Sequence, residues 1–206
     1  MIGIIDYGAG NLHSVEKAIK RLGYPSVRIE DGTFTNVIDQ LILPGVGHAE
    51  QAMRQLDERG LTTYMQRKTD EGIPLLGICL GMQLLLEKSE EGDTSCLGYL
   101  QGTVREFSVE NQKVPHMGWN EVADSQQHFL LKDLPDTTDF YFVHSYHAEP
   151  KHQEHIIGLT NYGHEFASAI GNEQIMGVQF HPEKSGQAGL KLLDNFCRYA
   201  KKVEAC

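Results

Sequence analysis

The sequence lacks the features typical of membrane-spanning, secreted and nucleic-acid-binding proteins. Its longest apolar run, residues 74–86, is too short to cross a bilayer, and the N-terminus has no basic segment that would begin a signal peptide. Basic residues are also few. The 18 Lys and Arg against 28 Asp and Glu give a net charge of −10, which argues against nucleic acid or an anionic membrane as the main partner. We therefore expect a cytoplasmic protein.

Cysteine is scarce as well, and its spacing argues against a disulfide-rich fold. The four cysteines lie far apart and form no C-x-x-C pair: Cys79, Cys96, Cys197 and Cys206. A disulfide framework is therefore not expected. At least one thiol is then free for chemistry.

The motifs for metals and nucleotides are incomplete. Zinc normally takes three or four protein ligands, and the H-x-x-H pairs at 144–147 and 152–155 have no Cys, His or Asp cluster beside them. Gly8 and Gly10 resemble the start of a dinucleotide fingerprint, but His13 stands where the third glycine would be. No Walker A sequence occurs. We expect neither a metal nor a cofactor.

The first half of the chain contains short apolar runs that alternate with apolar residues at helical spacing. This alternation is typical of βαβ units and of a mostly parallel sheet. Strands are expected at 2–5, 26–29, 40–43 and 73–78. Helices are expected at 12–22, at 49–70 with a break near Gly60, and at 82–87.

The second half has a different pattern, with short runs of β-branched and aromatic residues that predict further strands. These are expected at 97–107, 114–122, 139–146, 156–161, 166–170 and 174–180, before a last helix at 189–201. We therefore expect one α/β domain over residues 1–206. Its central sheet would be mostly parallel and flanked by helices, with additional antiparallel strands in the second half.

Cys79 lies in the most informative stretch, residues 77–81. This stretch follows an apolar strand and opens a helix, and G-x-C-x-G is the cysteine form of a nucleophile elbow. Glycines permit the strained turn, while the helix N-terminus favours thiolate over thiol and offers backbone N–H groups to an oxyanion. The alternative is a cysteine buried in the core, which is a common place for this residue.

His181 is the candidate base for that thiol, with Glu183 to orient it. His181 ends a strand, and active sites gather at strand ends in parallel sheets. Pro182 holds the segment extended, so His181 and Glu183 can point to the same side. A hydrogen-bonded structural histidine is the alternative, but the elbow upstream favours the catalytic interpretation.

Three motifs together resemble class I, or triad, glutamine amidotransferases. They are Pro44-Gly45-Val46-Gly47, Gly77-Ile78-Cys79-Leu80-Gly81-Met82-Gln83 and His181-Pro182-Glu183. Their order and spacing match that family across nearly the whole chain. Four further stretches resemble the glutaminase subunits of imidazole glycerol phosphate synthase: 6–11, 115–120, 141–146 and 181–185. His48-Ala49 departs from the pattern, since many relatives carry Ala-Phe there.

This resemblance implies hydrolysis of the side-chain amide of glutamine to glutamate and ammonia. Cys79 would attack the carboxamide, His181 would pass the thiol proton to the leaving ammonia, and Glu183 would orient His181. The implied oxyanion and substrate site consists of the N–H of Leu80, the loop of Gly45, Val46 and Gly47, the side chain of Gln83, and the backbone around His144, Ser145 and Tyr146.

The resemblance also implies a partner on another chain, because the length of 206 residues matches a glutaminase without a fused synthase domain. The related subunits form a heterodimer with a (β/α)8-barrel cyclase. The cyclase uses the ammonia to make imidazole glycerol phosphate and aminoimidazole carboxamide ribotide in histidine biosynthesis. The implied interface residues are Asn11, Pro115, Met117, Trp119, Asn120 and Lys184.

Two alternatives to this function stay open. One is a paralogue that supplies ammonia to a different synthase, such as one that amidates a surface sugar. The other is a catalytically silent scaffold of the same fold.

Overall fold

The centre of the molecule is a parallel sheet that is buried on both faces. The computed structural model describes residues 1–8, 11–108 and 112–203. The parallel strands lie in the order β2 (Ser26–Ile29), β1 (Ile2–Ile5), β3 (Gln40–Gly45), β4 (Leu75–Cys79) and β13 (Ile175–Val178). Every residue of β1, β3, β4 and β13 is buried, as expected for apolar strands covered on both sides. The strands predicted in the first half are confirmed.

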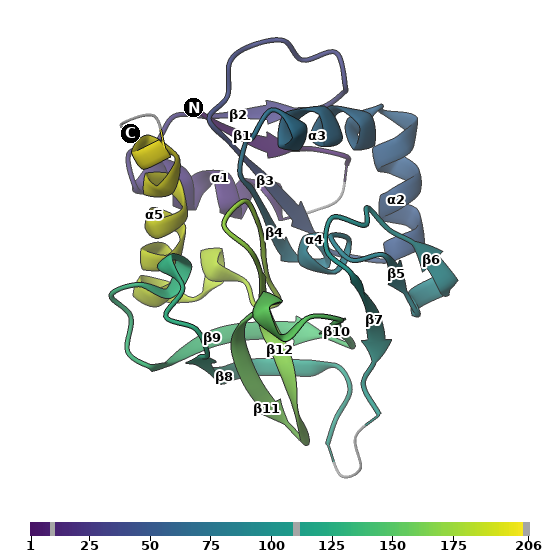
Figure 1. Ribbon diagram of the computed structural model, residues 1–206, viewed down its shortest axis with the longest axis vertical. Coiled ribbons are helices and arrows are strands. Elements are labelled where there is room, and N and C mark those ends of the chain that lie inside the picture. The colour runs from purple at the N-terminus through teal and green to yellow at the C-terminus, as the bar shows by residue number, and fades with distance from the viewer. Residues whose placement is uncertain (9–10, 109–111, 204–206) are drawn as a thin grey trace.

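Helices cover the two faces of this parallel sheet (Figure 1). α1 (Leu12–Arg21) and α5 (Gly186–Val203) lie on one side, and α2 (Ala49–Glu58) and α3 (Leu61–Asp70) lie on the other. Each side has its own apolar core. Gly60, in the left-handed conformation with φ 67°, separates α2 from α3 and confirms the predicted break.

The second half of the chain extends the sheet with antiparallel strands. β12 (His164–Gly171) pairs with β13, and β10 (Tyr146–Pro150) and β7 (Gly102–Glu106) follow. β11 (Ile156–Tyr162), β8 (His116–Asp124) and β9 (Thr137–His144) branch from β12. The predicted fold class is therefore confirmed: α/β, with a parallel centre and additional antiparallel strands.

Short elements connect these strands and helices. They are α4 (Leu80–Gln83), β5 (Lys88–Ser89), β6 (Thr94–Ser95) and the 3-10 turns η1 (Glu91–Asp93), η2 (Phe129–Leu131), η3 (Gln153–His155) and η4 (Pro182–Lys184). Cys206 and Gly10, which were considered above, lie outside the described residues.

Two predictions between residues 82 and 107 are wrong for one reason. The helix expected over 82–87 ends at Gln83, and the strand expected over 97–107 is confined to β7. The carbonyl groups of residues 84–86 accept hydrogen bonds from N–H groups within residues 97–100, at 2.8 to 3.0 Å. The two segments therefore bond to each other instead of forming a longer helix and a longer strand.

The strand expected over 139–146 is divided at Ser145. β9 ends at His144 and β10 begins at Tyr146. β9 pairs with β8, whereas β10 pairs with β7 and β12. The bend lies beside the carboxyl end of β4, since the Cys79 thiol is 3.9 Å from the Val143 carbonyl oxygen.

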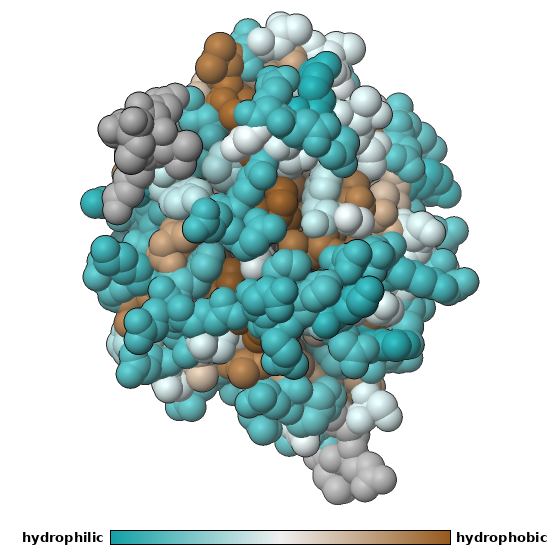
Figure 2. Space-filling model, in the orientation of Figure 1, coloured by the Kyte–Doolittle hydropathy of each residue, from teal (hydrophilic) through white to brown (hydrophobic). Residues whose placement is uncertain are grey.

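The face of the molecule in Figure 2 is largely hydrophilic, with apolar side chains in small separate patches. Among the described residues, the exposed large apolar side chains are Val37, Val114, Met117 and Trp119. All but Val37 belong to β8 or to the segment just before it. No helix in the described ranges has both the length and the hydropathy needed to cross a membrane.

Candidate active site

Cys79 occupies a sharp turn between β4 and α4. Its backbone has φ 55° and ψ −112°, which residues with side chains rarely adopt. Close packing holds the turn: a Cβ added at Gly77 would lie 2.5 Å from the Gly81 carbonyl oxygen, and one added at Gly81 would collide with the Leu43 carbonyl oxygen. The turn places the Cys79 side chain, 6% exposed, at the carboxyl edge of the sheet.

His181 lies at the same edge because β13, which precedes it, is the parallel neighbour of β4. The His181 N–H donates to the Tyr141 carbonyl at 2.9 Å, and the Ser185 hydroxyl donates to the His181 carbonyl at 2.7 Å. His181 Nδ1 donates to Glu183 Oε1 at 2.7 Å, and both side chains are buried. The structure thus brings together the three residues for which catalytic roles are predicted.

The protonation of His181 follows from its partners. The bond to Glu183 places the proton of the neutral ring on Nδ1 and leaves Nε2 as an acceptor. Nε2 is buried and has no hydrogen-bond partner among the described residues. Burial lowers the pKa of His181, but interactions with Cys79 and with the Glu183 carboxylate outweigh it and raise the pKa to about 9. His181 can therefore take a proton from Cys79 and hold it.

Asn11 contacts this cluster through its side chain. Its Nδ2 donates to Glu183 Oε1, the same oxygen that accepts from His181. Two donors on one oxygen fix the carboxylate behind the imidazole ring. The sequence predicts Asn11 as a partner contact, and the structure places its amide on Glu183.

A cavity of about 400 Å³ opens beside Cys79 and His181. Many of the predicted site residues line it: Val46, Gly47, Cys79, Leu80, Gln83, Pro115, His144, Ser145, Tyr146, His181 and Lys184. Gly45 packs behind this wall, since a Cβ there would lie 2.6 Å from the Gly81 nitrogen. Gly47, with φ 98°, has open space around it, so the loop after β3 has room to turn.

Two buried glutamines join Cys79 to the cavity wall. Gln83 Nε2 donates to the Tyr146 carbonyl at 2.9 Å and to Gln179 Oε1 at 3.0 Å. Gln179 Nε2 lies 3.8 Å from Cys79 Sγ. Gln179 is absent from the predicted site, although a single polar residue in an apolar strand was a usable signal.

Glu91 lines the cavity and is also absent from the predicted site. Its Oε2 accepts a hydrogen bond from the Ala49 N–H at 2.7 Å, at the start of α2. It lies in an acidic stretch that resembles an ordinary solvated segment, so the sequence carries no signal for it. Glu91 gives the cavity wall a carboxylate.

The comparison with protein families agrees with this geometry. The family model described as "Glutamine amidotransferase class-I" matches residues 3–200. The chain belongs to the class I glutamine amidotransferase family. It is therefore a member of an enzyme family whose motifs are present in its sequence.

Curated relatives of this amidotransferase are similar over nearly their whole length. The chain is 46% identical over 203 residues to "Imidazole glycerol phosphate synthase subunit HisH" of Desulfitobacterium hafniense (strain Y51), with 98% of this chain and 96% of the relative covered. It is 48% identical over 196 residues to the subunit of the same name in Moorella thermoacetica, with 95% and 93% covered.

Solved structures share the amidotransferase fold at low sequence identity. PurLQS from Thermotoga maritima has a TM-score of 0.76 at 16% identity, with 96% of this chain and 97% of that chain covered. The glutaminase domain of Trypanosoma brucei CTPS, solved with bound acivicin, has a TM-score of 0.69 at 17% identity, with 98% and 93% covered.

The residues of the amidotransferase that are predicted to contact a partner fall into two groups. Met117 and Trp119 are 62% and 59% exposed on β8, and Pro115 and Lys184 are exposed at the cavity. Asn120 differs from them, because its amide donates to the Asn161 carbonyl at 3.0 Å and lies 3.2 Å from His116 Nε2.

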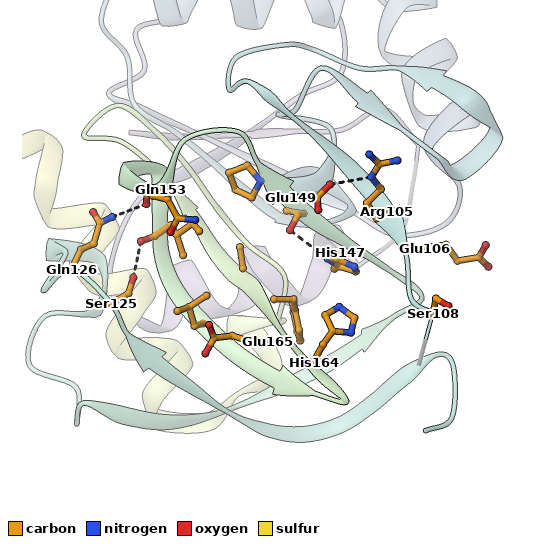
Figure 3. A pocket seen from close by; sticks show the side chains of 16 residues that line it. Arg105, Glu106, Ser108, Ser125, Gln126, His147, Glu149, Gln153, His164 and Glu165 are labelled. Atoms are coloured by element: carbon orange, nitrogen blue, oxygen red, sulfur yellow. Dashed lines mark hydrogen bonds and ion pairs between the residues drawn. The ribbon is translucent and has the colours of Figure 1, made fainter. Parts of the chain in front are cut away.

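A larger hollow, of about 770 Å³, is lined by residues of β7, β10, β11 and β12 (Figure 3). Arg105 pairs there with Glu149 at 3.0 Å, and the rings of His147 and His164 lie next to each other. Its described lining includes no cysteine, whereas Cys79 lines the smaller cavity.

In the part of the chain that the structure describes, no group of three or more His, Cys, Asp or Glu is arranged to hold a metal ion. The cavity of about 400 Å³ is the candidate active site, because Cys79 and His181 line it.

Proposed function

We propose that this amidotransferase hydrolyses glutamine with Cys79, His181 and Glu183. It delivers the ammonia in the cytoplasm to a (β/α)8-barrel cyclase that makes imidazole glycerol phosphate and aminoimidazole carboxamide ribotide for histidine biosynthesis. One observation carries the proposal: the strained elbow that presents Cys79 to the His181–Glu183 pair. The names of the relatives at 46% and 48% identity support the choice of pathway.

The first half of the reaction releases ammonia. His181 Nε2 takes the thiol proton, and the Cys79 thiolate attacks the side-chain carbonyl carbon of glutamine. The carbonyl electron pair moves to oxygen, and the oxyanion accepts hydrogen bonds from the Leu80 N–H and from the loop of Val46 and Gly47. The C–N bond then breaks, and the nitrogen takes the proton from His181. Ammonia leaves, and a glutamyl thioester remains on Cys79.

Water completes the cycle. His181 takes a proton from a water molecule, and the oxygen of that water attacks the thioester carbonyl carbon. The C–S bond breaks, the Cys79 sulfur regains its proton from His181, and glutamate leaves. Glu183, held by Asn11, orients the imidazole and stabilises its protonated form in both halves.

The opposite wall of the cavity suits the amino-acid end of glutamine. The Glu91 carboxylate attracts the α-ammonium group, because opposite charges interact strongly in a partly enclosed site. The backbone of Ser145 and Tyr146 offers hydrogen-bonding groups to the α-carboxylate, and Gln83 holds that backbone through the Tyr146 carbonyl. These contacts would leave the side-chain amide directed at Cys79.

The cyclase would dock over the rim of this cavity. Pro115 and Lys184 line the cavity, and Met117 and Trp119 are exposed on the strand that follows Pro115. Exposed Trp and Met side chains are typical of interface centres. A partner seated here would close the cavity and guide ammonia away from bulk water.

A glutamine-analogue electrophile tests the proposal. We expect it to label Cys79, seen by peptide mass spectrometry, and we expect excess glutamine to protect the thiol. Cys96 is the internal control for general reactivity, since burial raises the pKa of its thiol to about 11. Absence of labelling at Cys79, or labelling that glutamine does not slow, would contradict the proposal and favour a silent scaffold.

A further inference from the structure

Two buried histidines lie at the cavity: His144 is one of its lining residues, and His116 lies behind His144. His116 begins β8 and His144 ends β9, and the two are directly opposite each other across the strand pair. Their side chains are 2% and 6% exposed. His116 Nδ1 and His144 Nε2 lie 2.9 Å apart. Neither ring has a part in the reaction proposed above.

The hydrogen bonds through these rings run in one direction. His144 Nδ1 lies 2.8 Å from the Tyr146 carbonyl oxygen, which can only accept, so this nitrogen carries the proton. His144 Nε2 is then an acceptor, and His116 Nδ1 must donate to it. His116 Nε2 in turn accepts from Asn120 Nδ2 at 3.2 Å. The series from Asn120 through His116 and His144 to Tyr146, here called the histidine relay, thus has one consistent set of protons.

Both rings of the histidine relay are neutral. Burial lowers the pKa of His116 to about 4 and that of His144 to about 3. A proton added to His144 Nε2 would face the N–H group of His116 Nδ1. A proton added to His116 Nε2 would turn the acceptor of the Asn120 hydrogen bond into a donor. The relay is therefore a device for fixing positions rather than for carrying charge.

Aromatic packing makes the relay rigid. The His116 ring stacks on Phe142 and on Tyr162, with ring centroids 4.7 and 4.0 Å away. The Phe107 ring lies 5.2 Å from His144. Because water is excluded from such a cluster, a lost hydrogen bond in it cannot be replaced by one to solvent.

The relay ends on the cavity wall beside Cys79. The Tyr146 carbonyl accepts from His144 and also from Gln83, so both of its lone pairs are used. Ser145, at the bend before Tyr146, lines the cavity together with Gln83. The position of this wall therefore depends on the His144 donor of β9, which His116 of β8 holds in turn.

We propose that the histidine relay, through the Tyr146 carbonyl, fixes Gln83 and the backbone of Ser145 and Tyr146 in the cavity wall that binds glutamine. This inference rests on the proposed glutaminase function and adds His116 and His144 to it as positioning residues. Without the donor from His116, the His144 proton can move to Nε2, and an unprotonated Nδ1 would then repel the Tyr146 carbonyl oxygen. The effect falls on the KM for glutamine more than on kcat, because the relay does not touch His181 or Glu183.

Two isosteric variants of His116 separate positioning from simple packing. His116→Asn places an amide nitrogen near the former Nδ1 and keeps the donor to His144, whereas His116→Gln places its amide near Nε2 and loses that donor. With the partner cyclase present, we expect H116Q to raise the KM for glutamine roughly five- to tenfold, with kcat changed less than about twofold. H116N should return KM to within about twofold of the wild type.

The outcomes distinguish the relay from the underlying function. If KM rises equally in H116N and H116Q, in proportion to their losses of thermal stability, the proposed positioning role is refuted and His116 has only a packing role. An unchanged KM in H116Q, with a wild type that turns over glutamine, would overturn it as well. If the wild type does not turn over glutamine, the proposed glutaminase function is refuted. The proposed role of the histidine relay is then refuted as well, because it depends on that function.

A measurement on the wild type covers the case in which a variant fails to fold. Histidine ¹⁵N NMR at neutral pH should show His116 and His144 as neutral rings protonated at Nδ1. A proton on Nε2 of either ring, or a charged ring, would overturn the relay.

Discussion

At the scale of single residues, the site depends on groups held in unfavourable states by their neighbours. Cys79 keeps a backbone conformation with φ 55° because glycines on both sides leave no room for relaxation. His181 is buried, yet Cys79 and Glu183 raise its pKa from the ordinary value of 6.5 to about 9. The proposed nucleophile and base would then react without prior rearrangement of the protein.

Glu183→Gln tests this electrostatic account. Because the pKa of His181 is raised in the folded protein, protonation of His181 stabilises the fold below pH about 6.5, and that stabilisation is lost as the pH rises through about 9. We measure the free energy of unfolding by urea titration at pH 6 and at pH 9.5. Without the carboxylate, we expect its decrease between these two pH values to be smaller than in the wild type by about 1–2 kcal/mol. The kcat for glutamine should fall by about 100-fold or more.

The control for this change is Glu165→Gln, which removes a carboxylate exposed on β12. It should leave both the pH dependence of stability and kcat as in the wild type. A wild-type pH dependence in E183Q would refute the role assigned to Glu183.

The residues that could be predicted from sequence carry local signals. Cys79 lies between two glycines, and Pro182 and a strand end mark the pair of His181 and Glu183. Gln179 and His116 have partners far along the chain, such as Gln83, 96 positions before Gln179. Contacts of that kind are set by the fold, so the polar Gln179 in an apolar run is a local signal for a role but does not indicate its partners.

At the scale of elements, adjacent parallel strands bring Cys79 and His181 together. β4 and β13 pair in register, with Ile78 opposite Val178, so the residues that follow them emerge at one edge. These strands were predictable because both of their faces are buried and their sequences are continuously apolar. The structure of residues 82–107 was not predictable in the same way. Its first segment resembles a helix and its last a strand, but backbone hydrogen bonds join the two segments to each other.

Gly81→Ala tests the packing of α4 against β3. An added Cβ would collide with the Leu43 carbonyl oxygen, so the elbow must shift. We expect the free energy of unfolding to fall by about 3 kcal/mol or more, measured by urea titration, and glutamine hydrolysis to be lost.

Gly72→Ala is the matched control for this substitution. Gly72 has a positive φ, 86°, which Gly81 does not have, but nothing lies within 4 Å of the added Cβ. Its cost should be limited to backbone strain, about 1–2 kcal/mol. Equal destabilisation by the two changes would show that close packing at Gly81 does not hold the elbow.

At the scale of the whole molecule, the proposed reaction is divided between two chains. The net charge is −10 and the surface in Figure 2 is largely hydrophilic. Against that background, exposed apolar side chains lie on both sides of the cavity residue Pro115: Val114 comes directly before it, and Met117 and Trp119 follow on β8. The proposed nucleophile and the proposed docking surface thus share one edge, which is what direct transfer of ammonia would require.

Cys79→Ala in the complex with the cyclase tests the central claim most directly. The measurement is formation of imidazole glycerol phosphate, with either glutamine or an ammonium salt as the nitrogen source. We predict that glutamine-dependent synthesis falls by about 1000-fold or more, because no thiolate remains to attack the amide, while ammonium-dependent synthesis stays at the wild-type rate. Glutamine-dependent synthesis that survives in C79A would contradict the account.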